Sequence, residues 1–451
     1  NYMRIQEALK EIEDPRVQER TRHSLTDILM MCLIGFVCGI TLIEDIVFFF
    51  DTNLERFRKI IPFKNGVPDR NTVYRVLALI DDRKFEEVMV RIMKPYLDKV
   101  RGVVAVDGKR ICGSACGGNK GVHIVSAWAD EIGLCLAQYK TEEKSNEITA
   151  IPELLELLDL SGIIVTIDAM GCQKEICSMI IEKKSDYLIS LKGNQSTLHE
   201  DVKELFEKAD DEKFCKEYGI TQTEQKVEVD HGRIESRKCF LCTNLSWLRQ
   251  KDDWSGLNGV GMLISRRTVG GITSTEKRYF ITSLKDVNMA NCALRSHWGV
   301  ENNLHWTLDT VYNEDKVRNR EGHSAQNLNL LRKLSLNALK TAPLVSCKKK
   351  ILQISYIVNA IINSYIGNDT NLLYVIENMI KCFFKICTTE SVSGSIYLII
   401  FNIAIHFSGF ITVRDRDNIV SCSVHQKYFI GIISYLRIHI IIPNVFSVWS
   451  A

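Results

Sequence analysis

Two aspartates, each directly after an apolar run, are the residues of this chain whose placement first points to chemistry. Val103 to Val106 leads into Asp107, and Ile163 to Ile167 leads into Asp168. Such runs predict short strands buried on both faces, which are typical of sheets covered by helices on each side. Ligands collect at the strand ends of such sheets. We therefore expect the two carboxylates to form a cradle for a hard divalent cation.

Glu301 is a third candidate, because a strong helix predicted over 289–312 carries it. Three carboxylates suit a pair of Mg²⁺ ions, which activate one oxygen and stabilise another in the displacement of a phosphodiester. A single aspartate after an apolar run is equally typical of a turn or a helix cap. The hypothesis therefore rests on the set of three and not on any one of them.

The elements that must position these carboxylates are predicted from the period of the apolar residues. The order strand, strand, strand, helix, strand, helix, strand predicts a mixed five-stranded sheet with helices on both faces. The predicted strands are 103–106, 123–128, 134–139, 163–167 and 187–191, and the predicted helices are 148–158 and 172–183. A further helix is predicted over 325–340.

Residues 207–285 interrupt this pattern and predict a β-rich insertion. Its expected strands are 227–229, 236–242, 260–267 and 278–282, and it has a basic edge that includes Arg233, Arg237 and Lys238. The catalytic domain, insertion included, is assigned to 99–341.

Residues 1–98 predict a separate helical domain. Its helices are expected near 5–12, over 28–42 and 45–61, after a cap at Asp69 or Asn71, and from Asp81. Arg70 and Arg75 lie near a helix start, where they are candidates for docking on DNA. A solvated helix face explains the same two arginines.

The composition of the chain is that of an ordinary globular protein. It has 451 residues, 46% hydrophobic and 25% charged, with a net charge of +2. Any nucleic-acid surface must therefore be a local patch. The 15 cysteines follow no paired CxxC pattern, so free thiols in a reducing cytoplasm are expected and a structural zinc site is not.

Five ordered segments of the chain resemble the DDE transposases of bacterial insertion sequences, in the subfamily of the H-repeat-associated proteins. These segments are Val106–Lys109, Lys144–Ile148, Thr166–Gly171, Leu191–Gln195 and His297–Asn302. His23–Ile28 and Gly66–Pro68 resemble the helical domain that precedes the catalytic core in that family. The resemblance covers about residues 5–341.

The resemblance implies a ribonuclease-H-like core with a β insertion before the final glutamate. It implies metal ligation by Asp107, Asp168 and Glu301, with Mg²⁺ as the ion and Mn²⁺ as its substitute. The implied partners are DNA, as terminal inverted repeats and target, and a second copy of the chain in a homodimer. The implied compartment is the bacterial cytoplasm, with no stable membrane association.

DNA contacts are expected beside the strand ends and on the glutamate helix. Related transposases have an arginine four residues before the glutamate and a lysine seven after it, where this chain has His297 and Leu308. Arg295 is therefore expected to take over the phosphate contact. The full set of candidate DNA-binding residues is Lys109, Lys192, Asn194, Arg295 and His297, and surface solvation explains each of them as well.

Two other functions are compatible with the same residues. His297 and His305 lie four residues either side of Glu301 on one helix face, which suits a zinc hydrolase, although that function leaves Asp107 and Asp168 without a role. A catalytically decayed transposase that only binds DNA is the second alternative.

The tail, residues 342–451, departs from the family pattern. It is rich in isoleucine and poor in charge, and the change is abrupt. Ser395 to Ile411 approaches the length of a membrane anchor, but it contains Asn402 and His406, which are costly in a bilayer. An added domain is a second possibility. Translation past a frameshift is the interpretation we favour, because the tail shows no periodic design.

Overall fold

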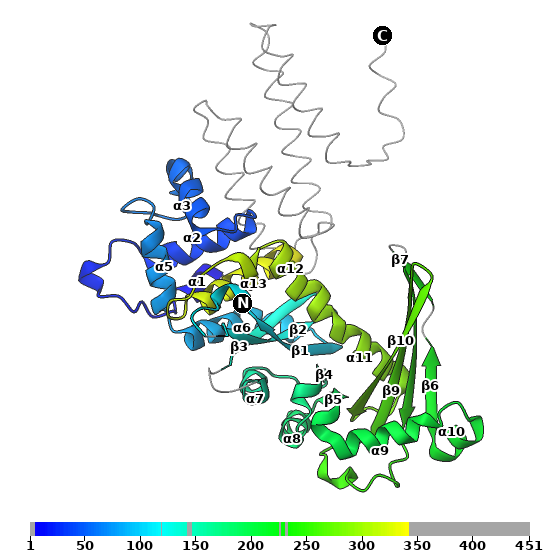
Figure 1. The fold of residues 1–451 in the computed structure, drawn as a ribbon. Helices are drawn as coiled ribbons and strands as arrows, with labels where there is room; N and C mark the ends of the chain where they lie inside the picture. Colours follow the sequence, from blue (N-terminus) through cyan, green and yellow to red (C-terminus); the bar gives the residue numbers. More distant parts are fainter. Residues whose placement is uncertain (1–4, 119, 142–146, 225–226, 231–232, 342–451) are drawn as a thin grey trace, which may run out of the picture. The chain divides into compact units, whose positions relative to one another are not determined.

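Five strands form the core of the sheet in the computed structural model, which describes residues 5–118, 120–141, 147–224, 227–230 and 233–341 (Figure 1). They are β1 (Val103–Arg110), β2 (His123–Ala129), β3 (Leu134–Lys140), β4 (Ile164–Ile167) and β5 (Asp186–Leu191). Their order is β3-β2-β1-β4-β5, with β1, β4 and β5 parallel and β2 antiparallel to both of its neighbours. This arrangement confirms the predicted mixed sheet and is that of a ribonuclease-H-like core.

Helices cover both faces of this core. α11 (Val287–Gly299) packs along β1, β4 and β5, where its His297 contacts Thr166. The next residue, Ile167, points to the opposite face. Ile167 borders Gly171, as does Ile151 of α7 (Glu147–Glu156), so α7 lies on the face opposite α11. α8 (Lys174–Glu182) packs against α7 and β5.

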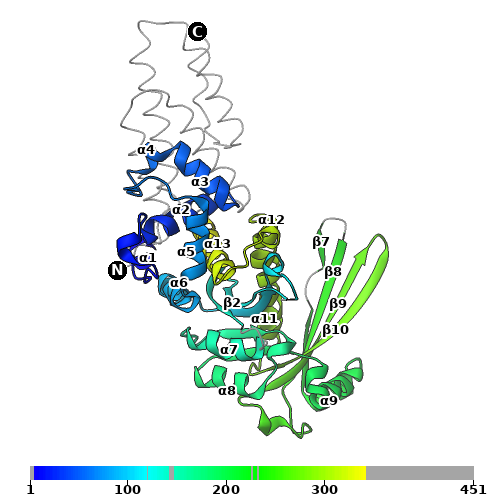
Figure 2. The same ribbon diagram turned by 60° about the vertical axis from the view of Figure 1, so that its left-hand side comes forward.

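The insertion continues the core sheet instead of forming a separate one. β10 (Ile272–Thr282) pairs antiparallel with β5, and the order continues through β9 (Gly259–Val269), β8 (Arg233–Cys242) and β6 (Ile220–Glu224). β7 (Glu228–Asp230) pairs with β8. Figure 2 shows β8, β9 and β10 extending well beyond the core. β6 and the helices α9 (Ser196–Glu207) and α10 (Glu212–Tyr218) were not predicted from the sequence.

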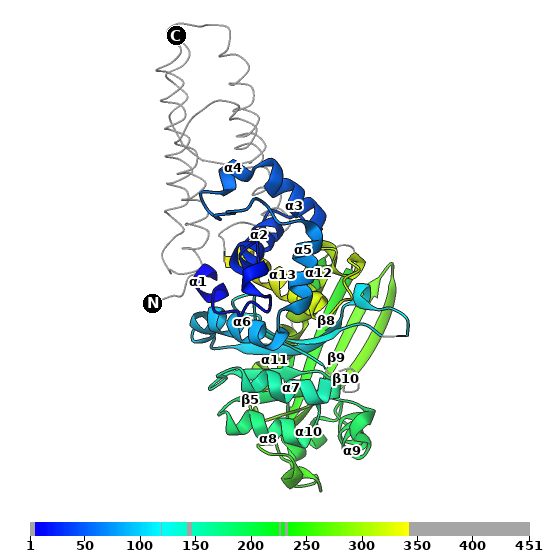
Figure 3. The same ribbon diagram turned by 90° about the vertical axis from the view of Figure 1, so that its left-hand side faces the viewer.

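The N-terminal helices form a bundle that also includes the last helix of the catalytic region. The members are α1 (Ile5–Leu9), α2 (Leu25–Val37), α3 (Ile43–Thr52), α4 (Leu54–Phe57), α5 (Arg70–Leu79), α6 (Asp82–Leu97) and α13 (Ser324–Thr341). Figure 3 shows α13 against α2 and α5, and the amide of Asn327 donates to the carbonyls of Leu77 and Ile80. The two regions therefore share one core within the described residues.

Side-chain caps define several of these helix starts. Asp69, one of the two predicted caps, accepts from the N–H of Asn71. Asp81, where a helix start was predicted, accepts from the N–H groups of Arg83 and Lys84. The single helix predicted over 45–61 is wrong: the chain breaks at Asn53, whose amide donates to the carbonyl of Phe49, and α3 and α4 are separate.

No helix in the described part of the chain is both long and apolar enough to span a bilayer. The expectations for the tail, including the segment Ser395 to Ile411, lie outside the described residues.

Candidate active site

Asp107 and Asp168 come from the two central parallel strands. β1 and β4 pair in register up to Val106 and Ile167, and the aspartates are the next residue on each strand. β4 ends there, whereas β1 continues to Arg110 with Asp107 opposite Ser126 of β2. The sequence predicted a strand that stops at Val106, but β1 continues past Asp107 to Arg110. Asp107 lies at the point where β1 no longer pairs with β4.

Asp168 is held by the turn that follows it. Its Oδ1 accepts hydrogen bonds from the N–H groups of Met170, at 3.0 Å, and Gly171, at 3.4 Å. Burial and the carboxylate of Glu147 raise the pKa of Asp168, while the two N–H groups and Lys192 oppose that rise. Asp168 is thus oriented by the backbone and lies close to a second negative charge.

Asp107 carries the largest electrostatic penalty of the site. Burial first, then the carboxylates of Asp168, Glu147 and Glu301, raise its pKa to about 7, and the Gly108 N–H partly opposes them. Nδ1 of His305 lies 3.5 Å from Oδ2 of Asp107. Burial lowers the pKa of His305 to about 3, so the imidazole is neutral near pH 7 and supplies no positive charge there.

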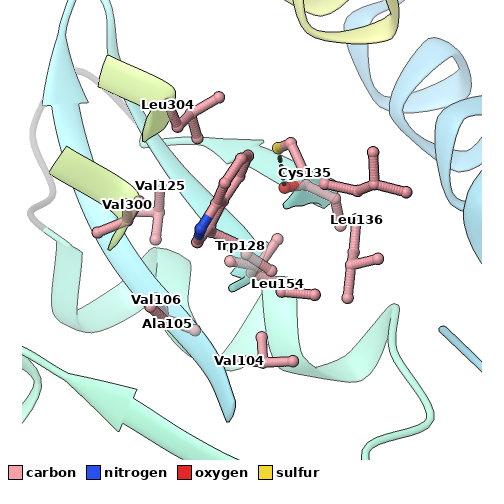
Figure 4. Close-up of a cluster of buried hydrophobic side chains, with 14 of the residues drawn as sticks. Val104, Ala105, Val106, Val125, Trp128, Cys135, Leu136, Leu154, Val300 and Leu304 are labelled. Carbon is pink, nitrogen blue, oxygen red and sulfur yellow. Dashed lines mark hydrogen bonds between the residues drawn. The ribbon is translucent and has the colours of Figure 1, made fainter. Parts of the chain in front are cut away.

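Glu301 lies on a helix that the core anchors through its apolar face. α11 begins with the Asp286 cap, continues as a π-helical segment, η6 (Val300–His305), and ends as α12 (Trp306–Thr310). Val300 and Leu304 are buried against Trp128 (Figure 4), which leaves Glu301 on the exposed side. π-Helical turns are rare and are frequent at functional sites.

Gly299 permits the close approach of this helix to the sheet. A Cβ at this position would collide with the carboxylate of Asp130 and would crowd Nε1 of Trp128. The absence of a side chain at Gly299 therefore helps to set the position of Glu301, two residues later.

His297 is half-buried and contacts β4. Its Nδ1 is 3.0 Å from Oγ1 of Thr166, and burial lowers its pKa to about 4. The two histidines of the zinc alternative thus have different partners, Thr166 for His297 and Asp107 for His305. Their contacts favour roles in packing and orientation.

Lys109 is also occupied within the protein. Its Nζ lies 2.7 Å from Asp309, 3.2 Å from Glu314 and 3.4 Å from Asp315, and its side chain is 12% exposed. These contacts argue against the DNA contact that the sequence suggested for Lys109.

The three remaining candidates for DNA contacts are exposed. Lys192 is close enough to lower the pKa of Asp168. Asn194 donates from Nδ2 to the carbonyl of Ala169, 2.7 Å away, and so links the turn after β5 to the turn that holds Asp168. Arg295 lies on α11, two residues before His297.

Two arginines of the insertion reach the helix that carries Glu301. The guanidinium of Arg278 lies 4.7 Å from the ring centroid of Trp298, and that of Arg237 lies 5.1 Å from it. Arg278 is also close enough to oppose protonation of His297. Arg278 was not identified from the sequence, because only the sheet pairing brings β10 beside α11.

Glu147 and His123 are further site residues to which the sequence assigned no role. Oε1 of Glu147 lies 2.7 Å from Nε2 of His123, and both side chains are largely buried, at 16% and 25% exposure. The segment Lys144–Ile148 drew attention to Glu147, but nothing in the spacing predicted that it lies near Asp107.

The chemistry of this donor set fits a divalent cation with oxygen ligands. Among the described residues, no three His, Cys, Asp or Glu side chains as they stand are close enough to hold a metal ion. The raised pKa values of Asp107 and Asp168 nevertheless indicate negative charge that no nearby cation fully compensates. A bound Mg²⁺ or similar ion would relieve that repulsion.

Comparison with known proteins places the chain among transposases. Residues 98–338 match the family described as Transposase DDE domain, and residues 6–93 match the family described as DDE_Tnp_1-associated. "Putative transposase YncI" of Escherichia coli O157:H7 is 39% identical over 339 residues, which cover 73% of this chain and 85% of that protein. "H repeat-associated putative transposase YhhI" of Escherichia coli (strain K12) is 35% identical over 348 residues, which cover 74% and 90%.

A solved structure of the piggyBac transposase synaptic complex with hairpin DNA aligns with this chain. The alignment covers 87% of this chain and 83% of the piggyBac chain. The TM-score is 0.37 and the sequence identity is 11%.

Proposed function

This chain belongs to the DDE transposase family, and from that premise we propose how its residues carry out the reaction of an insertion-sequence transposase. The enzyme cuts DNA and depends on a divalent metal. Our proposal concerns the residues that hold the metal, the identity of the metal, and the residues that contact DNA.

Asp107, Asp168 and Glu301 are the proposed metal ligands. The observation that carries this assignment is the pairing of β1 with β4, which brings Asp107 and Asp168 to neighbouring positions. The carboxylates of Asp168 and Glu301 are close enough to help raise the pKa of Asp107 to about 7. Asp107 and Asp168 come from adjacent parallel strands, and Glu301 comes from the helix above them. Such convergence of carboxylates is costly unless a cation neutralises it.

Mg²⁺ is the proposed ion, with Mn²⁺ as a substitute, because the ligands are hard carboxylate oxygens. Bound metal ions supply Lewis-acid activation of the attacking oxygen and stabilise charge on the leaving oxygen. The protein side chains contribute position: the backbone N–H groups orient Asp168, and His305 borders Asp107.

DNA is the substrate, and two surfaces beside the carboxylates suit its phosphate backbone. Lys192 is exposed beside Asp168. Arg278, which pairs with Glu276 and is 40% exposed, lies over Trp298 near Glu301. Contacts of this kind position a duplex without reading its sequence. Arg295 and Asn194 complete the proposed set.

The proposed reaction has two phosphodiester displacements. Water attacks the phosphodiester at the element end, which releases a 3′-hydroxyl. That 3′-hydroxyl then attacks a phosphodiester of the target DNA and joins the element to it. Because two ends must be paired, we propose that a homodimer carries out the reaction, in the cytoplasm of a bacterium.

The direct test uses end-labelled DNA that carries the inverted repeats flanking this reading frame. Incubation of the purified full-length chain with this DNA and Mg²⁺ should give cuts at the repeat boundary, and DNA of scrambled sequence should stay intact. Binding of the repeats without cleavage in either Mg²⁺ or Mn²⁺ would show a decayed transposase. Zinc in the purified protein, with activity that depends on it, would favour a zinc hydrolase.

A further inference from the structure

Glu147 lies at the start of α7, on the side of the sheet opposite α11, yet it acts on both aspartates of the site. Its carboxylate raises the pKa of Asp107 more than the carboxylate of Glu301 does. After burial, it is also the largest cause of the raised pKa of Asp168. The geometry agrees: Oε1 of Glu147 lies against Gly108, the residue after Asp107, and α7 packs against the turn Ala169–Gly171, which follows Asp168.

The packing around Gly108 brings Glu147 to this position. A Cβ on Gly108 would collide with Oε1 of Glu147 and with Nε2 of His123. Gly108 directly follows Asp107 on β1, so the absence of a side chain there lets the Glu147–His123 pair lie against the strand beside the catalytic aspartate. Any larger residue would displace that pair.

His123 restrains the side chain of Glu147. It lies on β2, paired with Arg110 of β1, and its Nε2 is 2.7 Å from Oε1 of Glu147. This contact holds Oε1 of Glu147. Ligating carboxylates in metal sites are typically held by such a hydrogen bond.

A purely structural ion pair would explain the contact with His123 but not the location of the pair. A structural carboxylate gains nothing from lying close to two other buried carboxylates, because like charges in a poorly solvated site repel. A carboxylate that shares a cation with them does gain from that position.

We propose that Glu147 is a fourth carboxylate of the metal site, which binds the divalent ion together with Asp107 and Asp168 and is oriented by His123. This inference rests on the proposed function of that site. It adds a ligand from α7, on the face of the sheet opposite α11. The ion would then have ligands from both faces, Glu147 on one and Glu301 on the other.

The test measures metal binding and stability instead of catalysis. Mn²⁺ is titrated into the full-length chain by isothermal calorimetry, without DNA, for the wild type, Glu147→Gln, Asp107→Asn and the control Glu156→Gln. Glu156 is an exposed residue of the same helix. Glu147→Gln should raise the Mn²⁺ dissociation constant at least about ten-fold, and Glu156→Gln should leave it unchanged.

The melting temperature of the metal-free protein separates a ligand from a structural residue. Because Glu147→Gln removes a repelling charge, the metal-free variant should melt at or above the wild-type temperature, whereas a structural role predicts a lower one. His123→Phe keeps a ring and removes the hydrogen bond, so it should weaken Mn²⁺ binding by less than Glu147→Gln does. Wild-type affinity in His123→Phe would remove the orienting role of His123.

Failure of this inference is distinguishable from failure of the proposed function. Wild-type affinity in Glu147→Gln together with lost binding in Asp107→Asn would overturn the role of Glu147 and leave the Asp107 site intact. If Glu147→Gln and Asp107→Asn both bind Mn²⁺ with wild-type affinity, the role of Glu147 and the proposed metal site at Asp107 are both overturned. If Glu147→Gln does not fold, Fe²⁺-mediated cleavage of the wild-type backbone replaces it: cuts near residue 147 that Mg²⁺ suppresses support the proposal, and their absence overturns it.

Discussion

The ammonium of Lys109 lies 3.2 Å from Oε2 of Glu314, a carboxylate with no exposed surface. Arg332 of α13, itself buried, lies 3.5 Å from the other oxygen of Glu314. The network therefore connects β1, two residues after Asp107, to the last helix of the N-terminal bundle. It couples the position of the strand that carries Asp107 to the packing of that bundle.

Replacing Lys109 should destabilise the protein instead of only weakening DNA binding. Lys109→Met removes one of the two cations that face buried Glu314. Because Arg332 stays in place, the loss should lie below the roughly 3–5 kcal/mol of a fully broken buried pair. Urea unfolding measures this loss. The matched variant Lys192→Ala removes an exposed lysine, so its stability should change by less than about 0.5 kcal/mol, while the salt slope of DNA binding should fall by about one. Equal stability of the two variants would contradict the structural role of Lys109.

Substitutions of the proposed metal ligands should abolish DNA cleavage and preserve DNA binding. Asp107→Ala, Asp168→Ala and Glu301→Ala each remove a carboxylate from the shared site, and Glu301→Gln does so at constant volume. Cleavage of labelled element ends measures the loss, and a gel-shift assay checks binding. Glu321→Gln, at an exposed carboxylate outside the site, is the control. Substantial cleavage by one of the variants would exclude that residue from the site.

The choice of divalent ion should separate binding from chemistry. Mg²⁺ and Mn²⁺ should support cleavage, whereas Ca²⁺ should permit DNA binding with little cleavage. The larger and looser coordination shell of Ca²⁺ positions the reacting oxygens poorly. Single-turnover cleavage in each ion provides the measurement, and full activity in EDTA would refute a metal-dependent reaction.

Glu86 should make the stability of the protein depend on pH between about 4.5 and 8. Its side chain is 1% exposed, and burial raises its pKa to about 8 from an ordinary value of 4.5. The folded state therefore binds this proton more tightly than the unfolded state, so this contribution to stability is present below pH 4.5 and is lost as the pH rises to 8. The slope approaches about 1.4 kcal/mol per pH unit for one group.

Glu86→Gln should remove that part of the pH dependence. Urea unfolding at pH 5, 6, 7 and 8 compares the variant with the wild type, and the variant should gain relative stability at each step. Parallel curves for the two proteins would show that Glu86 ionises normally in the folded state.

A chain that ends at Ala342 should be more soluble than the full chain and should retain DNA binding. The described elements end with α13 at Thr341, and the residues that follow are rich in isoleucine and poor in charge. Light scattering and a gel shift on both lengths provide the comparison. Aggregation of the short chain, with a monodisperse long chain, would show that the tail is needed for folding.

The sequence alone predicted most of the strands, most of the helices and the three candidate carboxylates, because these depend on local patterns. Apolar runs that lead into Asp107 and Asp168 predicted two strands of the sheet, and Asp81 marked a helix start correctly. Period and capping chemistry act over a few residues and can be read without knowledge of the fold.

Tertiary structure alone decided which of these residues meet. Alternating residues predicted the strands of the insertion, but only pairing between β10 and β5 joined them to the core sheet and brought Arg278 to Trp298. Lys109 has carboxylate partners about 200 positions later in the chain, and Glu147 packs against Gly108, which has no side chain in the way. Such contacts depend on distances between segments far apart in sequence, which local periodicity does not encode.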